Sequence, residues 1–305
     1  MTLWIRSVCI IQIIRKTLLM IGLSTYSLFL KKNYLESIQF AVDYGFQGVE
    51  IWSNVFDFVP GMVENGEIET IRTIAQKNHL SLAVHFIGDA NLADSNKGHL
   101  AESRKQLTET IRLCHDIGGN VVIIHPGIAA PLSIQNRHPL TQYPKFTLEN
   151  IKREALLRFK ESLQAATAIA EKSNIVIGLE NFSHVKNCLQ STYEDLVEWV
   201  DEIDSPALKI TLDLGHANLE GGVEKAIEAF GSRIVHMHLN DNDGKSSLHE
   251  KLGSGSIDWQ AIAPFLDSFD GMLSLELIGF DDPEGEVLES KAFLEELLTQ
   301  KVVGC

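Results

Sequence analysis

Cysteine is scarce in this sequence, and its few copies are widely spaced. The four cysteines are Cys9, Cys114, Cys188 and Cys305, and no two of them form a C-x-x-C motif. Disulfide frameworks and thiolate zinc sites depend on closely spaced cysteines, so neither is indicated here. This usage is typical of a reducing compartment, and we expect a cytoplasmic location.

Basic residues and long apolar runs are also in short supply. The chain has 26 Lys and Arg against 41 Asp and Glu, a net charge of −15, which argues against binding to a nucleic-acid backbone. The apolar run over residues 8–14 is ended by Arg15 and Lys16 before it reaches the length of a membrane span. We interpret residues 1–19 as a leader or the product of a misplaced start codon, and residues 20–305 as the domain.

No glycine-rich phosphate loop is present, neither G-x-G-x-x-G nor G-x-x-x-x-G-K-[ST], which disfavours a nucleotide-binding open sheet. Instead, short apolar runs alternate with amphipathic segments from Met20 onward. The expected strands cover residues 20–25, 47–52, 81–86, 120–125, 175–180, 207–213, 233–239 and 271–277. The expected helices cover residues 33–44, 67–78, 99–117, 149–173, 192–203, 221–230, 258–268 and 284–299. Eight strand–helix units with apolar strands predict an α/β fold, a single-domain (β/α)8 TIM barrel.

Ionisable residues end seven of the eight expected strands: Glu50, His85, His125, Glu180, Asp213, His238 and Glu276. In a barrel these side chains converge at the mouth, where active sites are built. One such residue alone is more often a structural loop residue, but a buried set without a counter-ion is costly to desolvate. We therefore expect a divalent cation, and ligands of carboxylate and imidazole without thiolate suit Mn²⁺, Mg²⁺, Co²⁺ or Zn²⁺.

Neighbouring residues refine this site. His236 and His238 point to the same side of their strand; His238 is the expected ligand, and His236, one layer deeper, has a structural or supporting role. Gly215 is expected to let the chain turn so that Asp213 and His216 both face the mouth.

Two features near the expected mouth have alternative interpretations. Trp52 either stacks on a bound ligand or packs in the core. The segment over residues 126–148, long and rich in proline, leaves the fourth strand at the mouth, and it is a lid, a binding loop or a disordered segment.

Six short motifs in register, GVEIW, VVIIHPG, GLEN, LDLGHAN, HMHLND and LSLEL, resemble the xylose isomerase-like TIM-barrel superfamily over about residues 20–300. That group contains sugar phosphate isomerases and epimerases, ketose 3-epimerases, inosose dehydratase-like enzymes and endonuclease IV-type nucleases. The resemblance implies a metal-dependent isomerase or epimerase acting on a sugar or sugar phosphate. The sequence leaves the oligomeric state open, with a homo-oligomer as one possibility. The implied metal ligands are Glu180, Asp213, His238 and Glu276, and the two glutamates are the implied acid/base pair. Substrate-binding or second-metal candidates are His216, His85, His125, His249, Glu50 and Trp52, and the ring of Trp52 would stack on the apolar face of the sugar.

The chain departs from both main branches of this superfamily. Ketose 3-epimerases place a glutamate where this chain has Lys186 and a substrate arginine where it has Gly244, which disfavours a free ketose as substrate. The alternative is an endonuclease IV-like multi-zinc phosphodiesterase acting on apurinic DNA, for which His85, His125, His216 and His249 match the additional histidines. Against it, Ser247 replaces the carboxylate of the D-x-H motif, and the net charge is acidic.

Overall fold

The computed structural model describes residues 19–53, 58–86, 90–129, 148–182, 185, 187–279 and 281–299. The predicted leader, apart from its last residue, lies outside this part of the chain, as does most of the predicted mouth segment. Lys186 lies outside it too.

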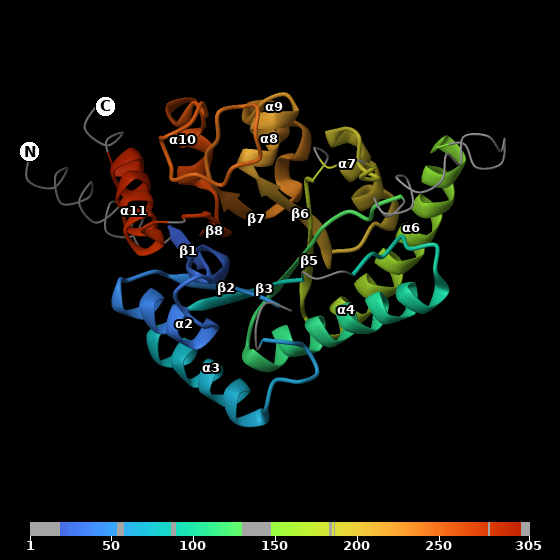
Figure 1. Cartoon of the computed structure of the whole chain (residues 1–305), viewed down its shortest axis with the longest axis horizontal. Coiled ribbons are helices and arrows are strands. Elements are labelled where there is room, and N and C mark those ends of the chain that lie inside the picture. Colours follow the sequence, from blue (N-terminus) through green and yellow to red (C-terminus); the bar gives the residue numbers. More distant parts are fainter. Residues whose placement is uncertain are drawn as a thin grey trace, which may run out of the picture.

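Eight parallel strands close into a barrel in chain order, with β8 pairing back to β1 (Figure 1). They are β1 (Met20–Ser24), β2 (Gly48–Trp52), β3 (Ser81–His85), β4 (Val121–Ile124), β5 (Val176–Glu180), β6 (Leu208–Asp213), β7 (Ile234–Leu239) and β8 (Met272–Leu275). Each overlaps one predicted strand. The predicted single-domain (β/α)8 architecture is confirmed over the described residues.

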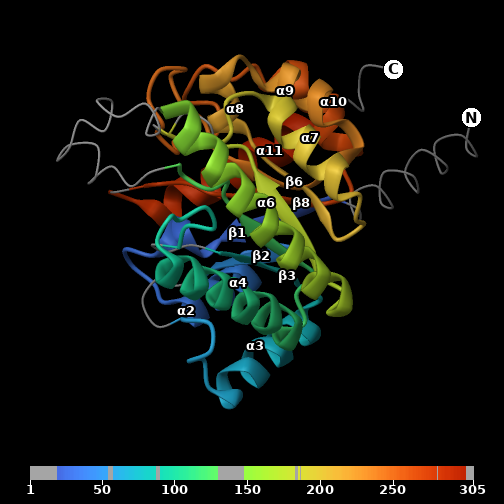
Figure 2. The ribbon, with the colours of Figure 1, turned by 90° about the vertical axis from the view of Figure 1, so that its right-hand side faces the viewer.

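Helices surround the strands, as the two perpendicular views show (Figures 1 and 2). They are α2 (Tyr34–Asp43), α3 (Asn65–Asn78), α4 (Lys97–Ile117), α6 (Leu148–Lys172), α7 (Tyr193–Ile203), α8 (Leu214–Glu220), α9 (Val223–Phe230), α10 (Trp259–Ser268) and α11 (Pro283–Thr299). Local signals start and end several of them: Asn33 and Thr192 form capping boxes at α2 and α7, and Gly118 ends α4 in the left-handed conformation.

Two short elements next to the mouth were not predicted. The 3₁₀ helix η1 (Thr25–Leu28) follows β1 directly, and α8 follows β6. The helix predicted over residues 221–230 instead begins at Val223. Gly221 and Gly222 separate α8 from α9 with φ of 132° and 113°, a conformation that other residues rarely adopt. A second 3₁₀ turn, η4 (Gly231–Arg233), leads into β7.

The strands divide their side chains between two cores, because successive residues of a strand face opposite sides. Outward residues such as Leu23, Ile51 and Val84 join the large core beneath the helices. Inside the barrel, Ala83, Val121, Ile123 and Met272 form a separate apolar cluster, which we call the floor. Gly22 and Gly48 make room for the Met272 side chain, since a Cβ on either glycine would lie 2.5 Å from it. The polar end of the interior begins above this floor.

No helix within the described ranges has both the length and the apolar character that crossing a membrane requires.

Candidate active site

The inward-facing residues at the carboxyl ends of the strands form one buried polar cluster. Six of them are at most 2% exposed: Glu50, His85, Glu180, Asp213, His238 and Glu276. The seventh, His125, follows β4 and keeps 29% of its side chain accessible. The predicted convergence of strand-end residues is thus present in the structure.

Four of these residues bring their possible ligand atoms close together. One donor atom from each of Glu180, Asp213, His238 and Glu276 lies within 4.8 Å of every other. His238 Nδ1 is 3.4 Å from Glu180 Oε1, 3.4 Å from Glu276 Oε2 and 3.7 Å from Asp213 Oδ2. This nitrogen is buried and has no hydrogen-bond partner among the residues that the structure describes. A buried nitrogen that faces three carboxylates and has no hydrogen-bond partner fits a divalent cation. Ligands of both oxygen and nitrogen suit the Mn²⁺, Mg²⁺, Co²⁺ or Zn²⁺ expected from the sequence.

The pKa shifts of the clustered side chains also fit a bound cation. Burial alone would raise the pKa of Glu180, but the imidazoles of His125 and His238 hold it well below its usual value. The pKa of Glu276 is raised well above its usual value by burial and by the nearby carboxylates of Glu50 and Glu180, despite the opposing effect of His238. For His238, burial is outweighed by the carboxylates, first of all Glu276, and the pKa is raised well above 6.5. At Glu276, burial and the neighbouring carboxylates therefore outweigh the effect of His238, and a cation would relieve this repulsion.

Two histidines from neighbouring strands approach the other oxygen of Glu180. His85 Nε2 and His125 Nε2 are each 3.1 Å from Glu180 Oε2, and the three residues form a second group of possible ligands. Burial lowers the pKa of His85 to about 4, so its imidazole is neutral near pH 7. The same histidines are thus able to orient Glu180 or to ligate a second ion.

His216 and His249 complete the cluster from beyond the strands. His216 Nδ1 lies 2.9 Å from the Asn181 carbonyl oxygen and 3.2 Å from Glu180 Oε1. His249, from the loop between β7 and α10, has its Nδ1 3.1 Å from the carbonyl oxygen of Glu276. His216, His249 and Asp213 form a third group of possible ligands.

Asp213 is held by residues that the sequence analysis did not single out. Asn240 Nδ2 donates to Asp213 Oδ2 at 2.8 Å, and the His216 backbone N–H donates to Asp213 Oδ1 at 2.6 Å. Asn181 exchanges two hydrogen bonds with the Asp213 backbone, at 2.8 and 3.0 Å. The available signal was position: Asn181 directly follows Glu180, and Asn240 directly follows β7.

The turn predicted at Gly215 was wrong. Gly215 lies within α8 and is not among the described glycines with positive φ, so it does not serve a special turn. It provides space instead, because a Cβ there would lie 1.8 Å from Asn240 Oδ1. The glycine lets Asn240 approach closely enough to hold Asp213.

Trp52 lies at the edge of the site and contacts two of its glutamates. Its Nε1 donates to Glu276 Oε1 at 3.0 Å and to Glu50 Oε1 at 3.2 Å. Its ring stacks on Tyr26, with centroids 3.8 Å apart and an angle of 11°. Trp52 therefore orients Glu276, while stacking on a sugar stays a prediction for this partly exposed side chain.

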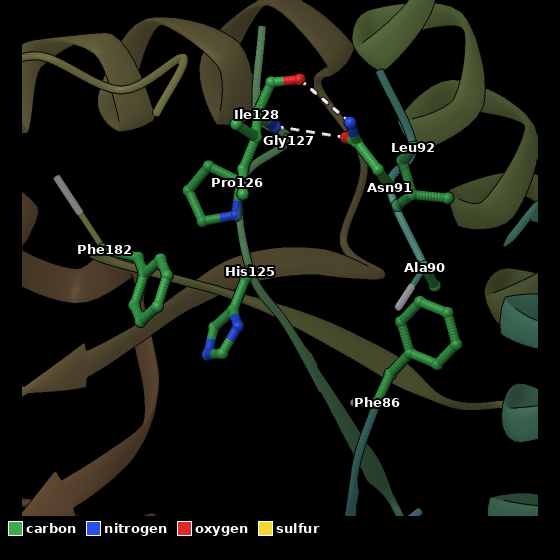
Figure 3. A pocket seen from close by; sticks show the side chains of 9 residues that line it. All are labelled: Phe86, Ala90, Asn91, Leu92, His125, Pro126, Gly127, Ile128 and Phe182. Carbon is green, nitrogen blue, oxygen red and sulfur yellow. Dashed lines mark hydrogen bonds between the residues drawn. The ribbon is translucent and has the colours of Figure 1, made fainter. Parts of the chain in front are cut away.

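A cavity of about 120 Å³ lies next to His125 (Figure 3). Phe182 stacks on His125 with ring centroids 4.1 Å apart, and Phe86 lines the opposite side of the cavity. The Asn91 side chain makes two hydrogen bonds to the Ile128 backbone. Its Nδ2 donates to the carbonyl oxygen at 2.9 Å, and its Oδ1 accepts from the N–H at 3.1 Å. Most of the described side chains around His125 are thus aromatic or apolar, and His125 itself contacts Glu180 Oε2.

Comparisons with known proteins agree with this architecture. A family model described as xylose isomerase-like TIM barrel matches residues 38–297. An uncharacterised protein, MJ1311, of Methanocaldococcus jannaschii is 30% identical over 241 residues, which cover 76% of this chain and 74% of that protein. A D-psicose 3-epimerase of Enterocloster bolteae is 31% identical over 122 residues, 40% of this chain and 39% of the epimerase.

Solved structures and a second group of relatives complete the comparison. The crystal structure of a D-tagatose 3-epimerase-like protein superposes with a TM-score of 0.73 at 26% identity, covering 92% of this chain and 99% of that one. A probable endonuclease 4 of Mesomycoplasma hyopneumoniae is 24% identical over 169 residues, 51% of this chain and 54% of the endonuclease. The class predicted from the sequence, isomerase or epimerase, is the class of several named relatives. Because the family model spans most of the chain, the protein belongs to the xylose isomerase-like TIM-barrel family.

Proposed function

We propose that the protein is a metal-dependent epimerase or isomerase of a sugar or sugar phosphate. Glu180, Asp213, His238 and Glu276 would hold the cation, and Glu180 and Glu276 would transfer protons. The observation that carries this proposal is the buried His238 Nδ1 facing three carboxylates. The epimerases among the relatives support it.

The positions of Glu180 and Glu276 suit them to proton transfer on opposite faces of a sugar. A divalent cation bound by the four residues would polarise the carbonyl and hydroxyl oxygens of a sugar and so acidify the adjacent C–H bond. Glu180 ends β5 and Glu276 follows β8, three strands further around the barrel, so a sugar between them meets one carboxylate on each face. One carboxylate removes the proton, and the other returns a proton to the opposite face.

Neighbouring groups hold both carboxylates in place. His85 and His125 contact Glu180 Oε2, and Trp52 donates to Glu276 Oε1. Orientation of the reacting groups is itself a large part of catalysis, because it removes the entropy cost of aligning them. The cavity beside His125 would receive the part of the substrate that does not react. Gly244, at the position of the epimerases' arginine, favours a substrate other than a free ketose, and the aromatic side chains of Phe86 and Phe182 would pack against it.

Exchange of a substrate C–H hydrogen with solvent deuterium tests this proposal. NMR would follow exchange over a panel of sugars, sugar phosphates and keto-glycosides incubated with the Mn²⁺-reconstituted protein. We expect exchange with one class of substrate, and loss of that exchange in Glu180→Gln. The matched control is Glu198→Gln on the surface of α7, where the side chain is 70% exposed, and it should exchange normally. Undiminished exchange in Glu180→Gln would contradict the acid/base assignment.

A second candidate function is a multi-metal phosphodiesterase. It is favoured by one observation, that His85, His125 and Glu180, and separately Asp213, His216 and His249, lie close enough to hold further ions. Against it, Ser247 is exposed and carries no carboxylate for the third ion. Cleavage of a duplex containing one abasic site, dependent on Zn²⁺ and lost in His125→Gln, would favour this function over the epimerase.

A further inference from the structure

Glu50 is a fully buried carboxylate that is not one of the four ligands of the proposed cation. It is 0% exposed. Its Oε2 accepts hydrogen bonds from His236 Nε2 at 2.7 Å and from His238 Nε2 at 2.9 Å. Its Oε1 accepts from Trp52 Nε1 at 3.2 Å and from Ser24 Oγ at 3.4 Å. Glu50 also lies close enough to His85, His238 and Glu276 to form a group of possible ligands. However, both of its oxygens already accept hydrogen bonds from neighbouring side chains, which ties the carboxylate to those residues.

The contact to His238 determines which of its ring nitrogens carries a proton. An ionised carboxylate only accepts hydrogen bonds, so the imidazole nitrogen that faces Glu50 must be Nε2–H. In a neutral imidazole the other nitrogen, Nδ1, then has a free lone pair. Nδ1 is the atom that faces Glu180, Asp213 and Glu276. The two nitrogens of one ring therefore have different tasks, one toward Glu50 and the other toward the proposed cation.

Glu50 reaches His238 from across the barrel. It belongs to β2 and His238 to β7, and these strands do not pair with each other. The second donor on the same oxygen, His236, lies two residues before His238 on β7, and this pair of contacts restricts rotation of the carboxylate. Trp52 extends the network, since its Nε1 bridges Glu50 Oε1 and Glu276 Oε1.

We propose that Glu50 is a positioning residue that fixes the Nε2–H tautomer and the ring orientation of His238, so that Nδ1 is available as a ligand. This inference rests on the proposed cation site. It assigns Glu50 neither a substrate contact nor a place among the ligands. Carboxylates that orient ligating histidines in this way strengthen metal binding by roughly 10- to 100-fold.

The alternative explanation is that the Glu50 network only stabilises the barrel. Removing a purely structural ion pair lowers the free energy of unfolding but leaves the tautomer of His238 and the affinity of a folded protein for metal unchanged. The two explanations therefore differ in two measurable quantities besides activity.

The first measurement determines the tautomer of His238. In the wild-type protein it does not depend on whether a variant folds, and in folded Glu50→Gln it shows whether the tautomer changes once the carboxylate is lost. Long-range ¹H–¹⁵N correlation spectra of the ¹⁵N-labelled, Zn²⁺-loaded protein report which nitrogen of His238 is protonated. We expect Nε2–H with Nδ1 bound to Zn²⁺. A His238 bound through Nε2, or protonated at Nδ1, would overturn the inference.

The second measurement compares metal affinities by competition with a chelator. We expect Glu50→Gln, which keeps the shape of the side chain but not its charge, to bind Zn²⁺ about 10- to 100-fold more weakly. The matched control is Glu198→Gln on the surface of α7, which makes the same change of side chain where the residue is 70% exposed and should bind Zn²⁺ as well as the wild type. Cooperative thermal unfolding of both variants establishes that they are folded.

The outcomes separate this inference from the proposed function. Wild-type affinity in folded Glu50→Gln would overturn the role of Glu50 and leave the cation site intact. Failure of the wild-type protein to bind any divalent cation would overturn the cation site and the role of Glu50 together.

Discussion

The two ends of the barrel interior differ sharply although the same strands build them. At the floor, Ala83, Val121, Ile123 and Met272 form an apolar cluster. At the mouth, carboxylates and imidazoles are buried together. Met272 begins β8 and Glu276 directly follows its end; both are almost completely buried, at 4% and 2% exposed. These two residues are thus buried to nearly the same extent, and they differ in the chemistry of their side chains.

This difference separates stability from function. The floor stabilises the fold by burying apolar surface, whereas the mouth buries ionisable groups at a cost to stability. Such a cost is expected where a cation and a substrate are to be bound, and active sites of TIM barrels usually lie at this end. Substitutions at the two ends should therefore have opposite consequences.

The largest effect is expected for Glu276→Gln at the mouth. Loss of a direct ligand should lower the affinity for Mn²⁺ by about 100-fold or more, because even residues that only orient ligands contribute 10- to 100-fold. The free energy of unfolding, measured by urea denaturation with a chelator present, should stay the same or rise. Burial and the neighbouring carboxylates raise the pKa of Glu276, so its charge is unfavourable without a cation. Unchanged Mn²⁺ affinity would remove Glu276 from the site.

Met272→Ala at the floor should show the reverse pattern. Truncation of a buried methionine leaves a cavity, and we expect a loss of about 2–5 kcal/mol in the free energy of unfolding. The affinity of the folded protein for Mn²⁺ should be close to that of the wild type. If Met272→Ala lost metal binding while it stayed folded, the separation of floor and mouth would be contradicted.

Gly215→Ala should affect both quantities, since it alters packing within the mouth. The new Cβ would lie 1.8 Å from Asn240 Oδ1 and push Asn240 away from Asp213. We expect a loss of about 1–3 kcal/mol in stability together with weaker Mn²⁺ binding. The matched control is Gly66→Ala in α3, where a Cβ meets nothing within 4 Å, and it should be neutral or slightly stabilising. Equal behaviour of the two variants would contradict the spatial role of Gly215.

The smallest effect is expected for Phe182→Ala beside the cavity. Loss of an aromatic contact should raise KM about 2- to 10-fold for the substrate identified by exchange, with Mn²⁺ affinity unchanged. Steady-state kinetics with a matched Phe265→Ala control on α10, away from the lining residues, would test this. An unchanged KM would show that the cavity does not receive the substrate.

Much of the fold and the ligand set could be predicted from the sequence. Apolar runs with one ionisable residue at the end located the strands and brought Glu180, Asp213, His238 and Glu276 to the same edge. The short helix α8 was missed because LGHANLE contains a glycine and ends at two more, a pattern typical of a loop. The contact of Glu50 with His238 was missed for a different reason. It joins side chains from strands that do not pair, and only closure of the barrel with its register brings them within 2.9 Å.

The most direct test of the central claim is the metal content of the purified protein, by elemental analysis after excess metal is removed. The four-residue site predicts about one divalent ion per chain, retained by the wild type and lost by Glu276→Gln. Two or three zinc ions, with occupancy dependent on His85 and His125, would instead favour the phosphodiesterase. No bound ion after reconstitution with Mn²⁺, Mg²⁺, Co²⁺ or Zn²⁺ would contradict the account.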